Sequence, residues 1–419
     1  MKMQQFDFCQ STLQAAQQAE KSARAAFEKI EQTAQFNQKK VLEAFINNRV
    51  SETDFACSTG YGYGDTGRDK LDRVYAEALG AQDALVRHSF TCGTHTLAVA
   101  LFGVLRPGDT MLCVTGTPYD TIHSVIGLTG NGMGSLKDFG VNYSQVDLNE
   151  NGEPDLEKIE KAALSKPAMV YIQRSRGYLL RPSLSCEKIR EISDTVKRVS
   201  PDTIIMVDNC YGEFVEKTEP TQAGADLMAG SLIKNAGGGI ARTGGYIAGR
   251  ADLVEKCAYR ATTPGLGREV GCTLGENRNM FMGLFNAPQA VASALKTAVF
   301  AAEMFKNAGF KVTPQSCEER HDIIQAICLE NSQRLIAFCR AIQSCSPVDS
   351  HLTPEPWDMP GYDSKVIMAA GAFTLGSSIE LSADAPLREP FAVWMQGGLN
   401  FESSRLAVMR AYEDIMEIK

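Results

Sequence analysis

Residues 226–245 read DLMAGSLIKNAGGGIARTGG, so Lys234 follows a run of small and apolar residues and stands before three glycines. Lysine is costly to desolvate and is rarely buried without a partner. A surface lysine at the start of a loop is therefore the ordinary interpretation. Whether Lys234 has a function depends on which residues the rest of the chain gathers around it.

Apolar segments with strand character alternate with helical segments on the N-terminal side of Lys234 and continue just beyond it. Strands are expected at 83–88, 111–115, 168–173, 203–208 and 246–249, and helices lie between them, among others at 94–105 and 186–199. This alternation predicts an α/β fold with a mostly parallel sheet sandwiched between helices.

The pattern differs on either side of this region, which predicts three parts. We expect an N-terminal helical arm over 1–50, a large α/β domain over 51–285 and a smaller C-terminal α+β domain over 286–419. In the last part the sequence predicts helices and strands in the order helix 288–309, strand FKVTP at 310–314, helix 319–343, short strands around 366–382 and helix 402–418.

The composition is that of a globular protein with a large core. The 419 residues are 44% hydrophobic, and 42 Lys+Arg against 50 Asp+Glu give a net charge of −8. This balance argues against a nucleic-acid partner, and the lack of any run of 18 apolar residues argues against a membrane span. The N-terminus lacks the apolar core of a secretory signal, and the twelve cysteines are scattered without a CxxC pair. We therefore expect a cytoplasmic protein with reduced thiols and no metal site.

In an open α/β sheet, ligands bind beyond the carboxyl ends of the strands. Asp208 ends the apolar run IIMV, 26 residues before Lys234. Taken alone, Asp208 could equally be a turn residue. In pyridoxal phosphate enzymes, however, a carboxylate pairs with the pyridine nitrogen and a lysine holds the aldehyde carbon as a Schiff base.

Three further features fit a phosphorylated, flat cofactor. The turn Cys92-Gly93-Thr94 opens an apolar helix, and a helix N-terminus offers N–H groups to a phosphate. Ser231, three residues before Lys234, could add a hydroxyl, and Tyr119 could stack on the ring. Two of them have an ordinary alternative: the turn could be a βα turn with Thr94 as N-cap, and Tyr119 could be a core or surface tyrosine.

Together these motifs resemble the fold-type I, aspartate aminotransferase-like pyridoxal phosphate enzymes. The sequence is most similar to the cystathionine and methionine lyase group, and within it to the bacterial methionine γ-lyase or aluminium resistance branch. The likeness rests on VDNC at 207–210, SLIK at 231–234 and longer stretches such as LRPGDTMLCVTGTPYDTIHSVIG, and it covers nearly the whole chain after the arm.

The resemblance implies a role for each matching residue. Lys234 resembles the Schiff-base lysine, Asp208 the partner of the pyridine nitrogen and Tyr119 the stacking aromatic. The phosphate cradle is matched by Cys92, Gly93, Thr94 and Ser231. In the family, a segment similar to STGYGYGDTGRD at 58–69 reaches the phosphate of a neighbouring subunit, and Tyr61 matches its tyrosine. A homodimer or homotetramer with shared active sites is therefore implied.

Three positions depart from the family pattern. Tyr63 stands where the family has an arginine, Ile233 where a threonine usually precedes the lysine, and Arg242 where this branch has proline. The first two departures reduce the expected grip on the phosphate.

A substrate carboxylate calls for an arginine, which can bind it with two parallel hydrogen bonds. Relatives supply this residue from the C-terminal domain, which favours Arg388, and Arg174 and Arg176 in QRSRGY are alternatives. The predicted activity is β- or γ-elimination on a sulfur-containing amino acid such as cystathionine, methionine or cysteine. Lys234 would then be the base for the α-proton, and desolvation with nearby cations would lower its pKa.

Other interpretations remain open. The same cofactor supports γ-replacement, racemisation and aldol cleavage, and the fold could also persist in a stress-response protein without turnover. The segment GYGDTG at 62–67 imitates a dinucleotide-binding motif, with Asp83 downstream, but no apolar strand precedes it. Cys92 and His95 could form a thiol–imidazole pair, although no third orienting group is evident.

Overall fold

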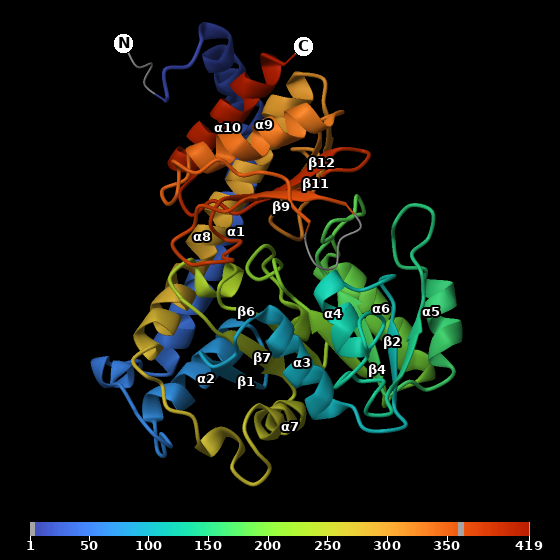
Figure 1. Cartoon of the computed structure of the whole chain (residues 1–419). Coiled ribbons are helices and arrows are strands. Elements are labelled where there is room, and N and C mark those ends of the chain that lie inside the picture. Colours follow the sequence, from blue (N-terminus) through green and yellow to red (C-terminus); the bar gives the residue numbers. More distant parts are fainter. Residues whose placement is uncertain (1–4, 359–363, 419) are drawn as a thin grey trace. The chain divides into compact units, whose positions relative to one another are not determined.

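A computed structural model describes residues 5–358 and 364–418. The chain forms two compact units, one of residues Phe36–Asn286 and one of Met1–Gln35 with Ala287–Lys419 (Figure 1). We describe each unit separately, as unit 2 and unit 1 respectively. The boundaries between the units fall inside two long helices, α1 (Gln10–Asn47) and α8 (Asn277–Asn307).

Unit 2 is built on a seven-stranded sheet in the order β1-β7-β6-β5-β4-β2-β3. Strands β2 to β6 pair in parallel, whereas β7 runs antiparallel to both of its neighbours. The expected mostly parallel sheet is therefore confirmed. The strands are β1 (Asp83–Arg87), β2 (Thr110–Cys113), β3 (Asn142–Gln145), β4 (Met169–Gln173), β5 (Ile204–Asp208), β6 (Leu227–Ser231) and β7 (Gly245–Gly249).

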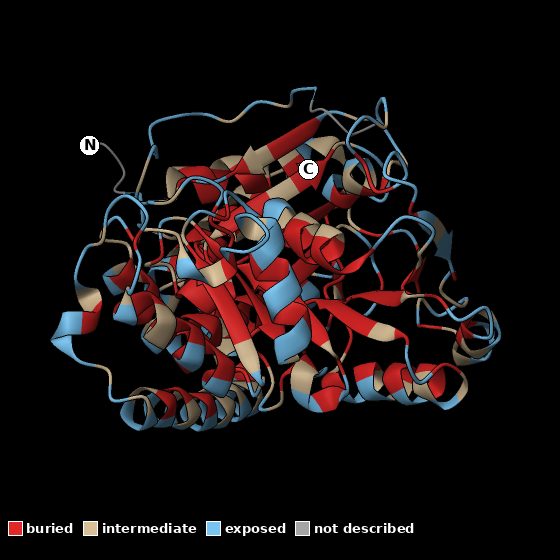
Figure 2. Cartoon of the chain, turned by 90° about the horizontal axis from the view of Figure 1, so that it is seen from below, coloured by how far each residue is buried: buried red, intermediate tan, exposed pale blue. Residues whose placement is uncertain are grey.

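Helices flank this sheet, and its strands are largely buried (Figure 2). One face of the sheet packs against α3 and α7, with Met206, Leu227 and Ala229 among its core residues. The helices of this unit are α2 (Thr66–Ala78), α3 (Gly93–Val104), α4 (Asp120–Ile126), α5 (Leu156–Ala163), α6 (Cys186–Val199) and α7 (Ala251–Ala261).

Unit 1 contains a five-stranded antiparallel sheet in the order β10-β11-β12-β9-β8, with α9 (Ser332–Ser344) and α10 (Phe401–Met416). The smaller α+β part expected at the C-terminus is therefore present. Its strands are β8 (Lys311–Thr313), β9 (Ile324–Cys328), β10 (Val366–Ala369), β11 (Ser382–Pro386) and β12 (Ala392–Gln396).

One expected element is wrong. A single helix over 319–343 was expected, but the first part of that segment forms β9, a fully buried strand at Ile324–Cys328. Its β-branched residues favour an extended strand between two neighbours. The helix begins only after Asn331, whose side chain caps it by accepting a hydrogen bond from Arg334 N at 2.9 Å.

Candidate active site

The candidate site lies at the carboxyl ends of adjacent parallel strands in unit 2. Asp208 is the last residue of β5, and Ser231 is the last residue of β6. The β5–β6 register pairs Asp208 with Ala229. Because strand side chains alternate between faces, Ser231 lies on the same face as Ala229 and therefore as Asp208. This face is the one that packs against α3.

Asp208 is held in place by two donors. It is 6% exposed. Its Oδ1 accepts a hydrogen bond from Cys210 N at 3.1 Å, and its Oδ2 accepts one from the Tyr171 hydroxyl at 3.3 Å. Burial raises the pKa of the Asp208 carboxyl, while Lys234 and these donors oppose the rise. The donors and the lysine thus favour a charged carboxylate in a buried place.

Lys234 lies three residues after β6, with its Nζ 4.0 Å from the centre of the Tyr211 ring. Burial alone lowers its pKa, but Coulombic interactions with Cys210, Tyr211 and Asp208 outweigh burial, so that the pKa is raised. The expected lowering by neighbouring cations is therefore wrong for the cofactor-free protein, because the groups that shift this pKa are acidic. These acidic neighbours favour the protonated amine in the cofactor-free protein.

The predicted phosphate cradle comes together around the first residue of α3. A Cβ atom on Gly93 would lie 3.3 Å from Ser231 Cβ and 3.6 Å from Cys210 Sγ. The Ser231 side chain is fully buried, and its Oγ has no hydrogen-bond partner among the described residues. A buried hydroxyl without a partner, next to a glycine at a helix N-terminus, fits the needs of a phosphate.

The other two members of the turn have local roles. Cys92 is the N-cap of α3, and its Sγ accepts a hydrogen bond from His95 N at 3.4 Å. The Thr94 hydroxyl donates to Thr121 Oγ1 at 2.8 Å, which joins the starts of α3 and α4. A phosphate role for Cys92 and Thr94 stays a prediction.

Tyr119 directly precedes α4 and is partly buried. Its ring lies 5.8 Å from the Tyr178 ring, centre to centre. A Cβ atom on Gly177 would come within 3.3 Å of Tyr119, so glycine leaves room for this ring. Tyr119 also contributes to the raised pKa of Lys234, so it lies within electrostatic range of the amine. Unit 2 thus gathers the five predicted residues Gly93, Tyr119, Asp208, Ser231 and Lys234.

Comparison with known proteins supports the same interpretation. The methionine gamma-lyase family model matches residues 12–416. This chain belongs to the methionine gamma-lyase family. It is 46% identical over 403 residues to the uncharacterised protein YnbB of Bacillus subtilis, covering 96% of both chains.

Solved structures of relatives have the same fold over nearly their whole length. A carbon–sulfur lyase involved in aluminium resistance from Clostridium novyi is 51% identical, with a TM-score of 0.94 over 97% of this chain and 96% of that one. A Listeria monocytogenes protein described as involved in aluminium resistance is 49% identical, with a TM-score of 0.95 over 96% of this chain and 100% of that one. The expected aspartate aminotransferase-like architecture is confirmed.

Arg174, one of the arginines considered for the substrate carboxylate, is committed to the interior of this methionine gamma-lyase family fold. Its side chain is fully buried. All three guanidinium nitrogens donate hydrogen bonds to protein atoms: Leu184 O, Asn209 Oδ1, Gly212 O, Cys186 Sγ and Glu216 Oε1. Because its donors are all engaged within the protein, Arg174 is not available to bind a substrate carboxylate with two parallel hydrogen bonds. The prediction that Arg174 binds the substrate is therefore wrong.

The remaining predicted site residues are Arg176, Arg388 and Tyr61. Arg176 follows β4 and is 2% exposed. Arg388 lies in an exposed turn between β11 and β12 of unit 1. Tyr61 is 70% exposed and stacks on Tyr63, with ring centres 5.4 Å apart. The roles given to Arg176, Arg388 and Tyr61 stay predictions.

The competing motifs find no support in this fold. The glycine-rich segment at 62–67 follows a short 3-10 turn at Glu52–Phe55 and not a buried strand. A Cβ atom on Gly62 would lie 2.8 Å from the backbone of Cys272, which explains this glycine by packing. His95 Nδ1 accepts a hydrogen bond from Thr91 N at 3.1 Å, and Cys92 Sγ caps the helix.

Arg242, one of the departures from the family pattern, has a clear contact. Its guanidinium forms an ion pair with Glu276, which lies one residue before α8. This pair links the lysine-containing loop to the segment around 271–277.

Three residues at the site were missed by the sequence analysis. Tyr171 donates to Asp208, Cys210 lies beside Gly93, and Tyr211 lies under Lys234. Cys210 and Tyr211 lie two and three residues after Asp208, so their place in the chain was a usable signal. Tyr171 shares a strand face with Gln173, which pairs with Asp208, but the strand pairing was needed to see it.

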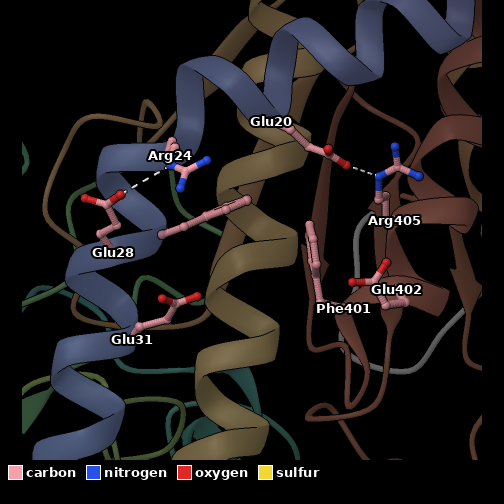
Figure 3. A pocket seen from close by; sticks show the side chains of 8 residues that line it. Glu20, Arg24, Glu28, Glu31, Phe401, Glu402 and Arg405 are labelled. Carbon is pink, nitrogen blue, oxygen red and sulfur yellow. Dashed lines mark hydrogen bonds and ion pairs between the residues drawn. The ribbon is translucent and has the colours of Figure 1, made fainter.

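A separate hollow of about 600 Å³ lies in unit 1, between α1 and α10 (Figure 3). Its charged side chains are largely neutralised by one another: Glu20 pairs with Arg405, and Arg24 pairs with Glu28 at 3.4 Å. Charges paired in this way leave little to recognise a ligand.

Two further observations concern metals and membranes. The described residues hold no group of three or more His, Cys, Asp or Glu side chains placed to bind a metal ion. Among the same residues, no helix is long and apolar enough to cross a membrane.

Proposed function

We propose that the protein is a pyridoxal phosphate-dependent carbon–sulfur lyase that acts on a sulfur-containing amino acid such as cystathionine, methionine or cysteine. The observation that carries the proposal is the placement of Lys234 and Asp208 within electrostatic range of each other, next to the Gly93–Ser231 cradle. Family membership over residues 12–416 supports it.

The described residues fit this cofactor at both of its ends. Asp208 would accept a hydrogen bond from the pyridine nitrogen, and its two donors, Cys210 N and Tyr171, stabilise the carboxylate that does so. The α3 N-terminus and the Ser231 hydroxyl would hold the phosphate. Bound pyridoxal phosphate supplies an electron-withdrawing ring that stabilises negative charge at the substrate α-carbon.

Proton transfer falls to Lys234. Its Nζ would hold the cofactor and, when free, accept the proton from the substrate α-carbon. In the cofactor-free protein the acidic neighbours favour the protonated amine. Nζ can therefore act as the base only while it is in its neutral form. Tyr119 would keep the ring flat and could pass a proton to the leaving thiol.

Subunit contacts and substrate binding complete the proposal. The exposed Tyr61 would reach the phosphate of a neighbouring subunit in a cytoplasmic homodimer or homotetramer. The exposed Arg388 or the buried Arg176 would bind the substrate carboxylate. Light scattering on the purified protein measures the assembly, and a monomer would remove the shared-site proposal.

The activity is tested by incubation with cystathionine, methionine and cysteine, followed by measurement of 2-oxo acids. Pyruvate indicates β-elimination, and 2-oxobutyrate indicates γ-elimination. If the protein binds the cofactor yet yields no 2-oxo acid from any of the three, the lyase proposal fails and other chemistry of the cofactor takes its place.

A further inference from the structure

The turn after Asp208 has a costly backbone. Tyr211 has φ 72° and Phe214 has φ 61°, in the left-handed region that bulky residues rarely enter. Such conformations persist only where the surrounding structure enforces them, and they cluster at functional sites. The structure must therefore hold this turn in place.

Arg174 is one anchor of the turn. Its Nη1 donates to Asn209 Oδ1 at 2.7 Å and to Gly212 O at 2.9 Å, so it grips the chain on both sides of Tyr211. A Cβ atom on Gly212 would lie 2.6 Å from the Arg174 side chain, so only glycine allows this approach. The buried arginine thus fixes the backbone around Tyr211.

A second anchor joins the turn to the lysine loop. Asn235, the residue after Lys234, donates from Nδ2 to Glu213 O at 3.1 Å. Both residues are fully buried. A side chain of the lysine loop therefore ties that loop to the backbone of the turn that carries Tyr211.

These hydrogen bonds position the Tyr211 ring in contact with the Lys234 side chain. Lys234 Nζ lies 4.0 Å from the ring centre, well inside the range of a cation–π interaction. The other groups that act on the ammonium ion include Asp208, Cys210, Tyr119 and Glu213. Each of these adds negative charge on ionisation, whereas the ring face attracts the cation without ionising.

We propose that Tyr211 is a positioning residue for Lys234. The face of its ring holds the ε-ammonium ion at the site whenever the amine is not bonded to the cofactor. Describing Lys234 as the cofactor lysine rests on the proposed function, but the contact between ring and amine does not.

The test is a pH titration of the full-length, cofactor-free protein carrying lysine labelled with ¹³C at the ε-carbon. The Lys234 signal is assigned with Lys234→Arg, and exposed Lys39 serves as the reference. Tyr211→Phe keeps the ring face and removes the hydroxyl. Tyr211→Asn removes the ring, and asparagine tolerates the left-handed backbone. Thermal unfolding checks that each variant is folded.

We expect the ε-protons of Lys234 to be shifted upfield of those of Lys39 in the wild type and in Tyr211→Phe, because both keep the ring current. In Tyr211→Asn this shift should vanish, and the pKa of Lys234 should fall by roughly 0.5–1.5 units. The proposal is overturned if Tyr211→Asn changes neither quantity, or if Tyr211→Phe lowers the pKa as much, which would assign the effect to the phenol oxygen. Because the titration uses neither cofactor nor substrate, its result is independent of lyase activity.

Discussion

A Cβ atom added to Gly93 would lie 3.3 Å from Ser231 Cβ, so the N-terminus of α3 and the end of β6 meet at the candidate phosphate site. This contact places a helix N-terminus beside a buried hydroxyl that has no partner among the described residues. A buried polar group without a partner destabilises the fold, so the hydroxyl calls for a functional explanation.

Ser231→Ala separates the effect on stability from the effect on binding. We expect the free energy of unfolding without cofactor to stay equal or rise by up to about 1 kcal/mol, because an unsatisfied hydroxyl is removed. Affinity for pyridoxal phosphate should fall roughly 5- to 10-fold, the equivalent of one lost hydrogen bond. Denaturant unfolding and fluorescence titration measure the two quantities.

The matched control is Ser193→Ala. This serine is also buried, but its Oγ donates to Gly224 O at 2.9 Å. The control should lose about 1 kcal/mol of stability and keep its cofactor affinity. Unchanged cofactor affinity in Ser231→Ala would argue against a phosphate at this hydroxyl.

Arg174→Met tests whether this arginine is structural. Removing the guanidinium leaves the buried Glu219 and the partly buried Glu216 without their cation. We expect a loss of roughly 3–5 kcal/mol in the free energy of unfolding. Arg198→Met, which removes an exposed ion pair with Glu160, should change it by less than about 1 kcal/mol. A stable Arg174→Met protein with a raised KM alone would restore Arg174 as a substrate ligand.

Glu213 makes stability depend on pH. Burial raises the pKa of this carboxyl from 4.5 to about 8. Between these values the folded protein keeps a proton that the unfolded chain releases, so its contribution is present below pH 4.5 and is lost as the pH rises toward 8. The loss is of the order of a few kcal/mol.

Glu213→Gln should abolish this part of the dependence of the free energy of unfolding on pH. The amide can still accept the hydrogen bond that the Tyr246 hydroxyl donates to Glu213 at 2.8 Å. The control is Glu255→Gln, since Glu255 accepts a tyrosine hydrogen bond on the surface. Denaturant unfolding between pH 5 and 8.5 measures how the free energy of unfolding of each variant changes with pH. Parallel curves for the wild type and Glu213→Gln would show that Glu213 is ionised throughout this range.

Much of the secondary structure of unit 2 could be predicted, because the pattern of apolar residues in each segment favours the same element that the folded core requires. The apolar run before Asp208 forms β5, and the amphipathic segment at 186–199 forms α6 with the expected bounds. Strand β6 was missed because Ala229 and Gly230 have low strand propensity. A Cβ atom on Gly230 would lie 2.4 Å from Glu213 Oε1, so packing selects glycine at that position.

Site residues could be predicted where their spacing along the sequence indicates their role. They could not be predicted where the role depends on contacts that form only in the folded protein. Lys234, Asp208 and Gly93 were found because spacing and strand ends point to them. Arg174 looked like a ligand because sequence shows its charge but not the buried acceptors around it. The acidic surroundings of Lys234 likewise come from residues that meet only in the folded state.

The most direct measurement is an absorbance spectrum of the protein with pyridoxal phosphate, before and after borohydride, followed by peptide mapping. We expect a band near the visible edge that borohydride abolishes, with the reduced cofactor on Lys234. Lys234→Ala should lack this band, while Lys217→Ala, which removes an exposed lysine that also lies over an aromatic ring, should retain it. A spectrum without the band, or a label on another lysine, would contradict the assignment of Lys234 as the cofactor lysine.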